Sequence, residues 1–481
     1  METQELRIKI SEMLVQALIE GLHVLKKKEN IIKEKKKWSF GSEYDNYKFG
    51  NIGRFESGVV NFSSSRKFKY QTVINLEEDV SKLQTWTQYH NFVINSDFFR
   101  EYYNFSRFND YAKELNIISH ITTYEIQKIL GSYIYLNNVD FSIDRELIDK
   151  LVEEFVNRIF IEYIDYSIWI PIVFTNFELD FYQLSENIFI KRIPKEIHIA
   201  RNANLNNSTT SQDLQLVIQG CSHALQFKGF QSLNLNYDSL NLDFFNKMNS
   251  KEFQSILDKV LGGFKILTDE SLSYYQIFAS SENCVLSRYA ELEGISTCRY
   301  VKNKFNENLL DRGWLEVPYK IKINELENVK KMLEMLSQAN YLELEFAIKK
   351  LIDGSLRNRE EDAIIDATVG LESLLTDKKS KSEINYKLSI RGGFITKLSP
   401  FFDLKPSEIR DALKRIYSYR SIIVHGGKEK DRLNKRSLKL RDKDYLCKVI
   451  AFQILRHCLK FFIENPKFKE LNKLDEEILN T

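Results

Sequence analysis

The stretch that decides the fold class is IRDALKRIYSYRSIIVHGG, residues 409–427. Its apolar side chains recur at intervals of three and four residues, which is the period of an amphipathic helix. Pro406 and Ser407, just before it, predict the helix start, with Ser407 as the N-cap residue. Gly426 and Gly427 predict the helix end. We therefore expect one complete helix here, with a defined start and a defined stop.

The same period continues on both sides of this helix. It dominates from residue 323 to residue 468, and only short segments interrupt it, so neighbouring helices are expected to pack antiparallel as a bundle. The predicted helices span about 323–337, 341–353, 359–375, 383–397, 407–425 and 443–463.

The residues before this bundle have a mixed pattern. Helical periodicity covers about 4–37 and 97–165, and a further helix is expected near 250–265. The alternation typical of strands covers about 38–76 and 168–198, and the polar run 204–212 predicts a loop. The sequence thus predicts an α+β fold, in which N-terminal regions of mixed helix and strand precede a C-terminal all-α helical bundle.

A length of 481 residues corresponds to about three domains. We expect an N-terminal helix with a small mixed domain over residues 1–165, a middle α+β domain over 166–322, and the bundle over 323–481. Only the bundle contains residues that suggest chemistry.

The composition is that of an ordinary globular protein, with 43% hydrophobic and 28% charged residues. The 18 glycines and 6 prolines are too few for collagen-like or proline-rich proteins, and they argue against architectures with several glycine-rich nucleotide loops. Because 69 basic residues balance 67 acidic ones, the net charge of +2 points to no class of partner. Only local clusters of charge can do so.

The five cysteines include no C-x-x-C pair, and their number is odd. This usage is typical of a reducing compartment without disulfides or zinc knuckles. Cys221 and His223 are two residues apart, but two ligands do not make a metal site, so we expect no metal and no cofactor. No apolar run is long enough for a membrane span, and no signal peptide is evident, which predicts a cytoplasmic protein without a membrane partner.

Arg420 stands out when residues 409–427 are placed on a helical wheel. At 100° per residue from Ile409, Arg420 falls at about 20°, between Leu413 at about 40° and Ile416 at about 340°. We therefore expect it within the buried stripe, where an unpaired charge is costly. Two interpretations remain: an ion pair inside the bundle, with Glu372 as the partner, or a functional group.

His425 falls at about 160° on the same wheel, about 140° from Arg420. The negative end of the helix favours a protonated imidazole there, which suits a general acid or a base that works near neutral pH. One straight helix directs the two side chains apart. They could still serve one site if the helix unwinds at Gly426, or if two copies of the helix related by a two-fold axis face each other. The plain alternative is a C-cap residue without chemistry.

Residues 420–425, RSIIVH, resemble the R-x4-6-H motif of HEPN domains, helical domains named for higher eukaryotes and prokaryotes nucleotide-binding. The Apea-like branch is more similar still, on the blocks DAIIDATVGLESLL (362–375), LSIR (388–391) and YSYRSIIVHG (417–426). The similarity covers about 330–465. Many members have Asn, Asp or His after the motif arginine, where this chain has Ser421. Arg192–His198 also fits the short motif, but Pro194 and strand-like neighbours speak against it.

The resemblance implies a metal-independent RNA endonuclease, often a toxin or an abortive-infection effector against phage. Because unregulated ribonuclease activity would harm the host, it also implies a sensor or regulatory role for the residues before the bundle, including the middle domain. Its expected partners are RNA, a second copy of the chain in a homodimer or higher even oligomer, and a phage-derived trigger or regulatory partner. Carried over by position, His425 would be the acid/base, and Arg420 would bind the scissile phosphate and stabilise its charge. The supporting residues would be Glu372, Arg391, Ser421 and Tyr417.

A basic segment follows His425. Residues 428–444 hold eight basic and four acidic side chains, a net charge of +4. Such a patch binds phosphates without reading sequence, whereas the alternative is a solvated loop. The predicted RNA-binding residues are Lys428, Lys430, Arg432, Lys435, Arg436 and Lys439, and a second basic cluster is formed by Lys378, Lys379, Lys381 and Lys387.

Two other functions stay open from the sequence. In one, the bundle is a non-catalytic RNA- or nucleotide-binding module, in which Arg420 and His425 hold phosphate and no cleavage follows. In the other, it is a structural helical dimerisation domain attached to a sensor domain, and His425 can be replaced freely.

Overall fold

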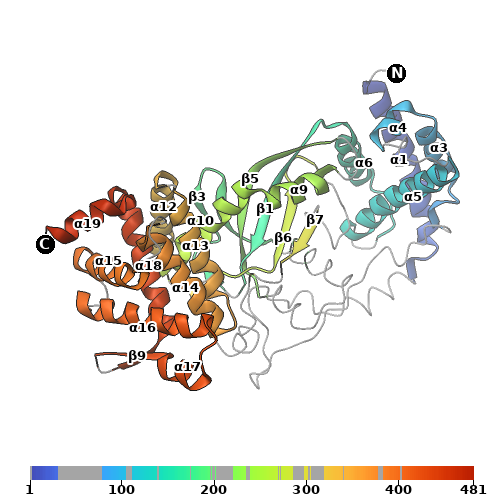
Figure 1. The fold of residues 1–481 in the computed structure, drawn as a ribbon. Coiled ribbons are helices and arrows are strands. Elements are labelled where there is room, and N and C mark those ends of the chain that lie inside the picture. Colours follow the sequence, from blue (N-terminus) through green and yellow to red (C-terminus); the bar gives the residue numbers. More distant parts are fainter. Residues whose placement is uncertain are drawn as a thin grey trace. The chain divides into compact units, whose positions relative to one another are not determined.

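The computed structural model describes residues 3–30, 79–103, 111–137, 140–173, 175–194, 197, 201, 220–234, 239–268, 270, 272–284, 297–301, 304, 319–339, 341–377, 383–400, 404–441 and 443–480. The fold is α+β, as predicted: helices and an antiparallel sheet in the N-terminal half are followed by a helical C-terminal half (Figure 1). The predicted strands over 38–76 and the predicted loop at 204–212 lie outside the described residues.

The chain forms two compact units. The first comprises residues 1–171, 191–247 and 276–300, and the second comprises 172–190, 248–275 and 301–481. The predicted three-domain division, with boundaries after residues 165 and 322, stays a prediction. No helix within the described ranges is long and apolar enough to cross a membrane.

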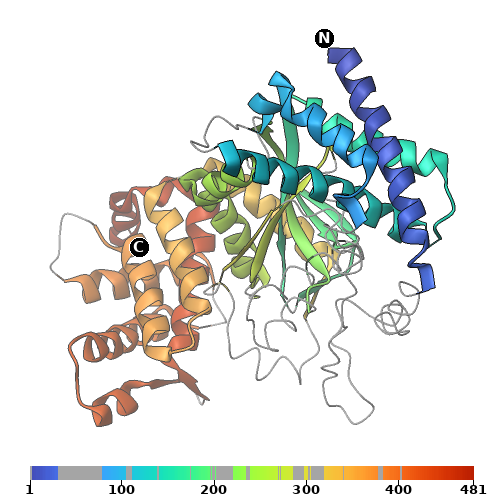
Figure 2. The ribbon, with the colours of Figure 1, turned by 90° about the vertical axis from the view of Figure 1, so that its right-hand side faces the viewer.

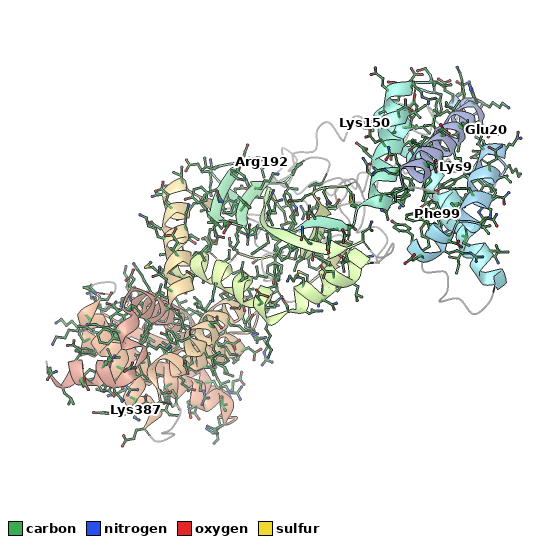
Figure 3. The ribbon with its side chains drawn as sticks, turned by 90° about the horizontal axis from the view of Figure 1, so that it is seen from above. Lys9, Glu20, Phe99, Lys150, Arg192 and Lys387 are labelled. Carbon is green, nitrogen blue, oxygen red and sulfur yellow. The ribbon has the colours of Figure 1, made fainter. Side chains whose placement is uncertain are left out.

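The first unit begins with a group of helices around one apolar core. They are α1 (Thr3–Lys26), α3 (Gln84–Ile94), α4 (Asp97–Tyr102), α5 (Tyr111–Leu136) and α6 (Arg145–Phe160). Phe99 is fully buried in this core (Figure 3). Helix α3 has no side-chain cap of its own, and Glu20 of α1 supplies it by accepting the backbone N–H groups of Gln84 and Thr85 at 3.1 and 2.9 Å.

The sheet of the first unit is antiparallel. Its strands are β1 (Tyr163–Pro171), β5 (His223–Leu233), β6 (Gln276–Ser281) and β7 (Thr297–Tyr300), in the order β5-β1-β6-β7. Figure 2 shows these strands, green to yellow, side by side. The central strand β1 has a paired strand on each edge. Its side chains are buried from Tyr166 onwards, and these include the polar Ser167 as well as large apolar residues. The helix α9 (Ser239–Asn249) follows β5 in the chain.

The second unit contains short strands before its helices. They are β2 (Thr175–Phe177), which pairs in parallel with β8 (Tyr319–Ile321), and the neighbouring strands β3 (Phe181–Ser185) and β4 (Ile188–Arg192). The prediction of strands over 168–198 is therefore confirmed through Arg192. Arg192 ends a strand, as the strand-like neighbours of the second motif match had predicted (Figure 3).

The helices of the second unit match the predicted ones within a few residues. They are α10 (Lys251–Thr268), α12 (Ile323–Gln338), α13 (Leu342–Ser355), α14 (Glu360–Leu375), α15 (Ile384–Leu398), α16 (Pro406–Val424) and α18 (Cys447–Glu464). Helix α18 packs against α13, α14, α16 and α10, and buried apolar residues extend from Cys447 to Ile463, although Val449 is exposed.

Five elements after α16 were not predicted. They are α17 (Glu429–Lys435), the hairpin of β9 (Ser437–Leu440) and β10 (Lys443–Leu446), the 3-10 turn η4 (Pro466–Lys469) and α19 (Leu471–Leu479). The expectation of an all-α bundle is corrected to this extent. Residues 443–446 pair as a strand because a tight turn at Arg441, with φ at 54°, folds them back on β9, so α18 begins at Cys447 rather than at 443.

Candidate functional site

The start of α16 differs from the prediction. Lys405, not Ser407, is the N-cap residue, and the helix begins at Pro406. Proline fits the first position because its missing N–H would have no helical partner there. The Glu408 carboxylate reaches back to accept the backbone N–H of Lys405 at 2.7 Å, which fixes the helix start in place of a hydroxyl cap.

The end of α16 is as predicted. Gly426 has φ at +70°, the left-handed region that glycine adopts without strain. The N–H of Gly427 donates to the carbonyl of Ile422 at 2.8 Å, and the N–H of Gly426 donates to the carbonyl of Ile423 at 3.3 Å. These two bonds form a Schellman motif, which closes the helix and leaves His425 as its C-cap residue.

Arg420 lies at the edge of the buried face, not in its middle. The residues of α16 that are buried are Ile409, Ala412, Leu413, Ile416 and Tyr419. On the wheel Arg420 lies about 20° from Leu413, near one border of this buried arc, and its side chain is 22% exposed. Val424, the last residue of α16, is 48% exposed, so the buried face ends before it.

Arg420 faces Glu372 of α14, the partner that the wheel suggested. Its Nη2 lies 4.0 Å from Glu372 Oε1, which is too long for a hydrogen bond. Among the described residues, neither Arg420 Nε nor Glu372 Oε1 has a hydrogen-bond partner, although both atoms are buried. The guanidinium also lies 5.7 Å from the centre of the Tyr417 ring. We call this an open ion pair: the two charged groups face each other without a hydrogen bond, and each keeps a buried polar atom that has no partner among the described residues.

The surroundings of this pair change the titration of Glu372. Burial raises the pKa of the Glu372 carboxyl, and the nearby Arg420 charge offsets this rise only in part. A carboxylate closed tightly onto an arginine would instead have a lowered pKa. The direction of the shift therefore agrees with the long distance between the two groups.

His425 is exposed at the helix end. No hydrogen bond or ion pair to its ring is found within the part of the chain that the structure describes. Helix α16 is regular up to Val424, and on an ideal helix Arg420 and His425 would be about 140° apart. Ser421 and Tyr417 are half-buried on the same helix. One chain by itself thus presents the two motif residues in different directions.

Arg391 of α15 serves a different contact. Its side chain is 4% exposed and donates twice to Asp475 of α19, at 2.8 and 2.6 Å. It also donates to the carbonyl of Leu375 at 2.7 Å and to Asp377 at 3.1 Å. These bonds hold the end of α14 and the helix α19 onto α15. Neither Arg420 nor Glu372 is among its partners.

The predicted basic segment divides into two groups. Lys428, Lys430 and Lys439 are exposed. The other three predicted residues are held by the protein: Arg432 donates to the carbonyl of Gly427 at 3.0 Å, Lys435 donates to the Ser418 hydroxyl, and Arg436 donates twice to Glu360, at 2.9 and 2.7 Å.

Of the second predicted basic cluster, the structure describes only Lys387. Lys387 is partly buried and pairs with Asp377 at 3.5 Å (Figure 3), whereas Lys378, Lys379 and Lys381 lie outside the described residues. Sequence reasoning missed Arg415, which donates to the carbonyls of Asn434 and Ser437 and so fastens α17 and β9 to α16. Its spacing on the helix carried no signal for this role.

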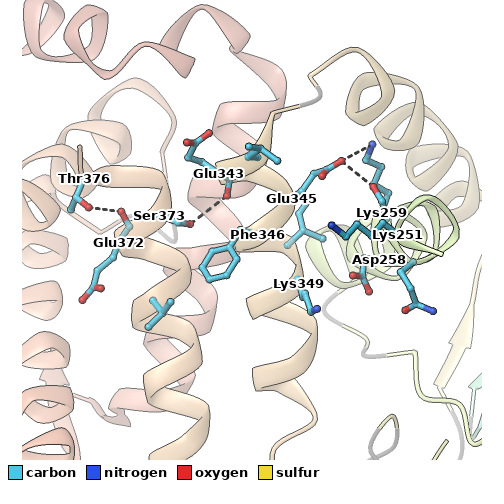
Figure 4. Close-up of a pocket in the computed structure, with 15 residues that line it drawn as sticks. Lys251, Asp258, Lys259, Glu343, Glu345, Phe346, Lys349, Glu372, Ser373 and Thr376 are labelled. Carbon is cyan, nitrogen blue, oxygen red and sulfur yellow. Dashed lines mark hydrogen bonds and ion pairs between the residues drawn. The ribbon is translucent and has the colours of Figure 1, made fainter. Parts of the chain in front are cut away.

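A cavity of about 850 Å³ lies between α10, α13 and α14 (Figure 4). Glu372 and the exposed ring of Phe346 line it. Across the cavity lining, Glu345 of α13 accepts hydrogen bonds from two residues of α10, Lys259 at 3.1 Å and Ser255 at 3.0 Å. The sequence could not reveal this cavity, because α10 is separated from α13 by more than seventy residues along the chain.

The described residues contain no group of three or more His, Cys, Asp or Glu side chains arranged to hold a metal ion. Cys221 is buried, and burial raises the pKa of its thiol. The neighbouring His223 exchanges a hydrogen bond of 2.8 Å with the Ser222 hydroxyl through Nδ1. Both residues thus belong to the interior of the first unit.

No family model, curated protein or solved structure matches this chain. The function is therefore inferred from the side chains themselves. The strongest constellation comprises the open Arg420–Glu372 pair, the exposed His425 and the exposed lysines that follow it.

Proposed function

We propose that this protein is a metal-independent RNA endonuclease of the HEPN type, acting in the cytoplasm as a regulated toxin or anti-phage effector. The observation that carries the proposal is the open pair of Arg420 and Glu372, separated by 4.0 Å with buried polar atoms left unpaired. A buried guanidinium needs hydrogen-bond acceptors. Two oxygens of a phosphate group would supply such acceptors to Arg420 in bidentate geometry.

The proposed chemistry uses the RNA's own 2′-hydroxyl as the nucleophile. The His425 imidazole accepts the proton of this hydroxyl, and the 2′-oxygen attacks the adjacent phosphorus. The same ring, now an imidazolium, donates that proton to the 5′-oxygen as the P–O5′ bond breaks. Arg420 stabilises the charge that develops on the phosphoryl oxygens. The products are a 2′,3′-cyclic phosphate and a 5′-hydroxyl.

In this proposal, the site is shared between two copies of the chain. Arg420 and His425 diverge on one helix, so the phosphate held by Arg420 of one protomer would meet His425 of its partner. A two-fold axis is the commonest symmetry of such pairs. The exposed Lys428, Lys430 and Lys439 would guide the RNA backbone toward the site.

The test compares the wild-type chain with His425→Ala on a 5′-labelled single-stranded RNA in EDTA. We expect cleavage to a 2′,3′-cyclic phosphate, and a loss of rate of roughly 10²- to 10⁴-fold in the variant while RNA binding is kept. His23→Ala is the matched control, because His23 is also exposed in the last turn of a helix. Equal rates for wild type and His425→Ala, or cleavage that requires added Mg²⁺, would contradict the proposal.

A second candidate is RNA binding without cleavage. It is favoured by the same exposed lysines and by Arg420, since these groups can hold phosphate without any proton transfer. In that case wild-type protein would bind the labelled RNA and leave it intact. Arg420→Ala would weaken this binding. His425→Ala would leave the RNA uncut, as the wild type does.

A further inference from the structure

A second cavity lies where α14, α16 and α17 meet. Its volume is about 450 Å³, and its lining includes Gly427 from the end of α16, Arg432 of α17 and Tyr419 of α16. Glu360 and Glu361, from the first turn of α14, form another wall. Gly427 is two residues after His425, so their Cα atoms are at most about 7 Å apart. The cavity thus opens beside the residue to which acid/base chemistry is assigned.

Glu360 is only half satisfied in this cavity. Its Oε2 accepts both bonds from Arg436, at 2.9 and 2.7 Å. Its Oε1 is buried and has no hydrogen-bond partner among the described residues, and the side chain is 16% exposed. The neighbouring Glu361 adds a second carboxylate. Burial, together with the charges of Glu360 and Glu361, raises the pKa of Tyr419 to about 12. A ligand bound against this wall would therefore have to present hydrogen-bond donors.

Guanidinium groups lie on the same cavity. Arg432 donates to the carbonyl of Gly427 at 3.0 Å through Nε. Its Nη groups make no hydrogen bond within the described part of the chain. The cavity therefore combines carboxylate acceptors with guanidinium donors, and the Tyr419 and Leu433 side chains add apolar surface.

We propose that this cavity binds a guanine base of single-stranded RNA, next to the scissile phosphate; the inference rests on the function proposed above. Guanine presents the donors N1–H and N2–H₂ side by side, which suit Glu360 Oε1 and Glu361. Its acceptors O6 and N7 suit an arginine. Adenine places an acceptor at N1, against a carboxylate, and uracil offers a single donor between two acceptors. Unstacked bases of single-stranded RNA are read through such edges.

Binding is measured with oligoribonucleotides whose 2′-oxygens are all methylated, so that cleavage through the 2′-oxygen is blocked. Each is a uridine chain with one guanosine, adenosine or inosine in the middle. We expect the guanosine strand to bind wild-type protein at least about ten-fold more tightly than the adenosine strand, the size of one hydrogen bond to a charged group. Inosine, which lacks the N2 amine, should bind several-fold more weakly than guanosine.

Two variants test the carboxylates. Glu361→Gln and Glu360→Gln should both reduce the preference for guanosine over adenosine, whereas Glu476→Gln, at an exposed position of α19, should keep it. Glu360→Gln also weakens the bond to Arg436 and can disturb folding, but the inosine comparison needs no substitution. Equal affinities of wild-type protein for the three strands would overturn this inference even if the enzyme cleaves RNA. A clear guanosine preference without cleavage of unmethylated RNA would uphold it and overturn the ribonuclease.

Discussion

Arg420 Nη2 and Glu372 Oε1 are 4.0 Å apart, between two helices that are packed against each other, and no hydrogen bond closes the gap. Burial without closure leaves the Arg420 guanidinium with unused donors. The open geometry distinguishes Arg420 from Arg391, which makes four hydrogen bonds and is 4% exposed. Arg420 therefore has more donors to offer to a ligand than Arg391, which uses four of its five.

The first prediction concerns assembly. Chains carrying Arg420→Ala are mixed with chains carrying His425→Ala under conditions that allow subunits to exchange. If each site takes one residue from each protomer, half of the dimers are mixed and one of their two sites is intact, so about a quarter of the wild-type activity should return. Each variant incubated alone should stay inactive. No recovery, or full activity from a strictly monomeric wild-type chain, would contradict the shared site.

The second prediction concerns the exposed lysines. Replacing Lys428, Lys430 and Lys439 together by alanine should weaken RNA binding and flatten its salt dependence by about 0.7 of a log–log slope unit for each phosphate that is no longer bound. The measurement is a salt titration of binding to a 2′-O-methylated RNA. The matched control replaces three other exposed lysines, Lys82, Lys150 and Lys397, and should leave the slope as it is. An unchanged slope in the first variant would show that its lysines only solvate the surface.

The third prediction concerns the pH dependence of stability. Because folding raises the pKa of Glu372, the stability linked to its protonated form is present in full below the unfolded pKa, about 4.3, and is lost as pH rises through the folded pKa. Glu372→Gln keeps a neutral side chain at every pH. The variant should therefore gain stability relative to wild type as pH rises above about 4.3, by about 1 kcal/mol or less.

This difference is measured by urea unfolding of both proteins between acidic and neutral pH. Glu476→Gln, at an exposed position, provides the baseline for removal of a surface charge. A relative loss of stability for Glu372→Gln with rising pH would mean that Glu372 is held as a carboxylate by Arg420, and would count against the open pair.

The fourth prediction concerns the packing of the bundle. A Cβ atom at Gly354 of α13 would lie 2.7 Å from Phe452 Cζ and 2.9 Å from Asp366 Cβ. Gly354→Ala should therefore destabilise the fold by roughly 1–3 kcal/mol, the usual cost of overpacking. Gly131→Ala in α5 is the control, because nothing lies within 4 Å of its added methyl group. The control substitution should raise the free energy of unfolding by about 0.5–1 kcal/mol. Thermal or urea unfolding measures the loss of stability in Gly354→Ala and the gain in Gly131→Ala.

Several features of the candidate site were predictable before any coordinates. The helix over 409–424, its stop at Gly426 and the divergence of Arg420 from His425 depend on the period of the helix and on the backbone freedom of glycine. The identity of the capping residue was wrong, because Glu408 closes the helix start from within the first turn. The burial of Arg420 was overestimated, because a wheel shows which residues share a face but not which neighbouring helices cover it.

The sequence by itself determined the α+β class, the order of the helices from 323 onwards and the end of α16, since these follow from the side-chain period and from turn residues, which act over a few positions. Only the tertiary structure decided which charges are free. Arg436 is bound by Glu360, 76 positions earlier, and Arg391 by Asp475, 84 positions later. Such pairs form between residues that approach each other only when the helices pack. The local sequence around either residue does not indicate which distant residue it will contact.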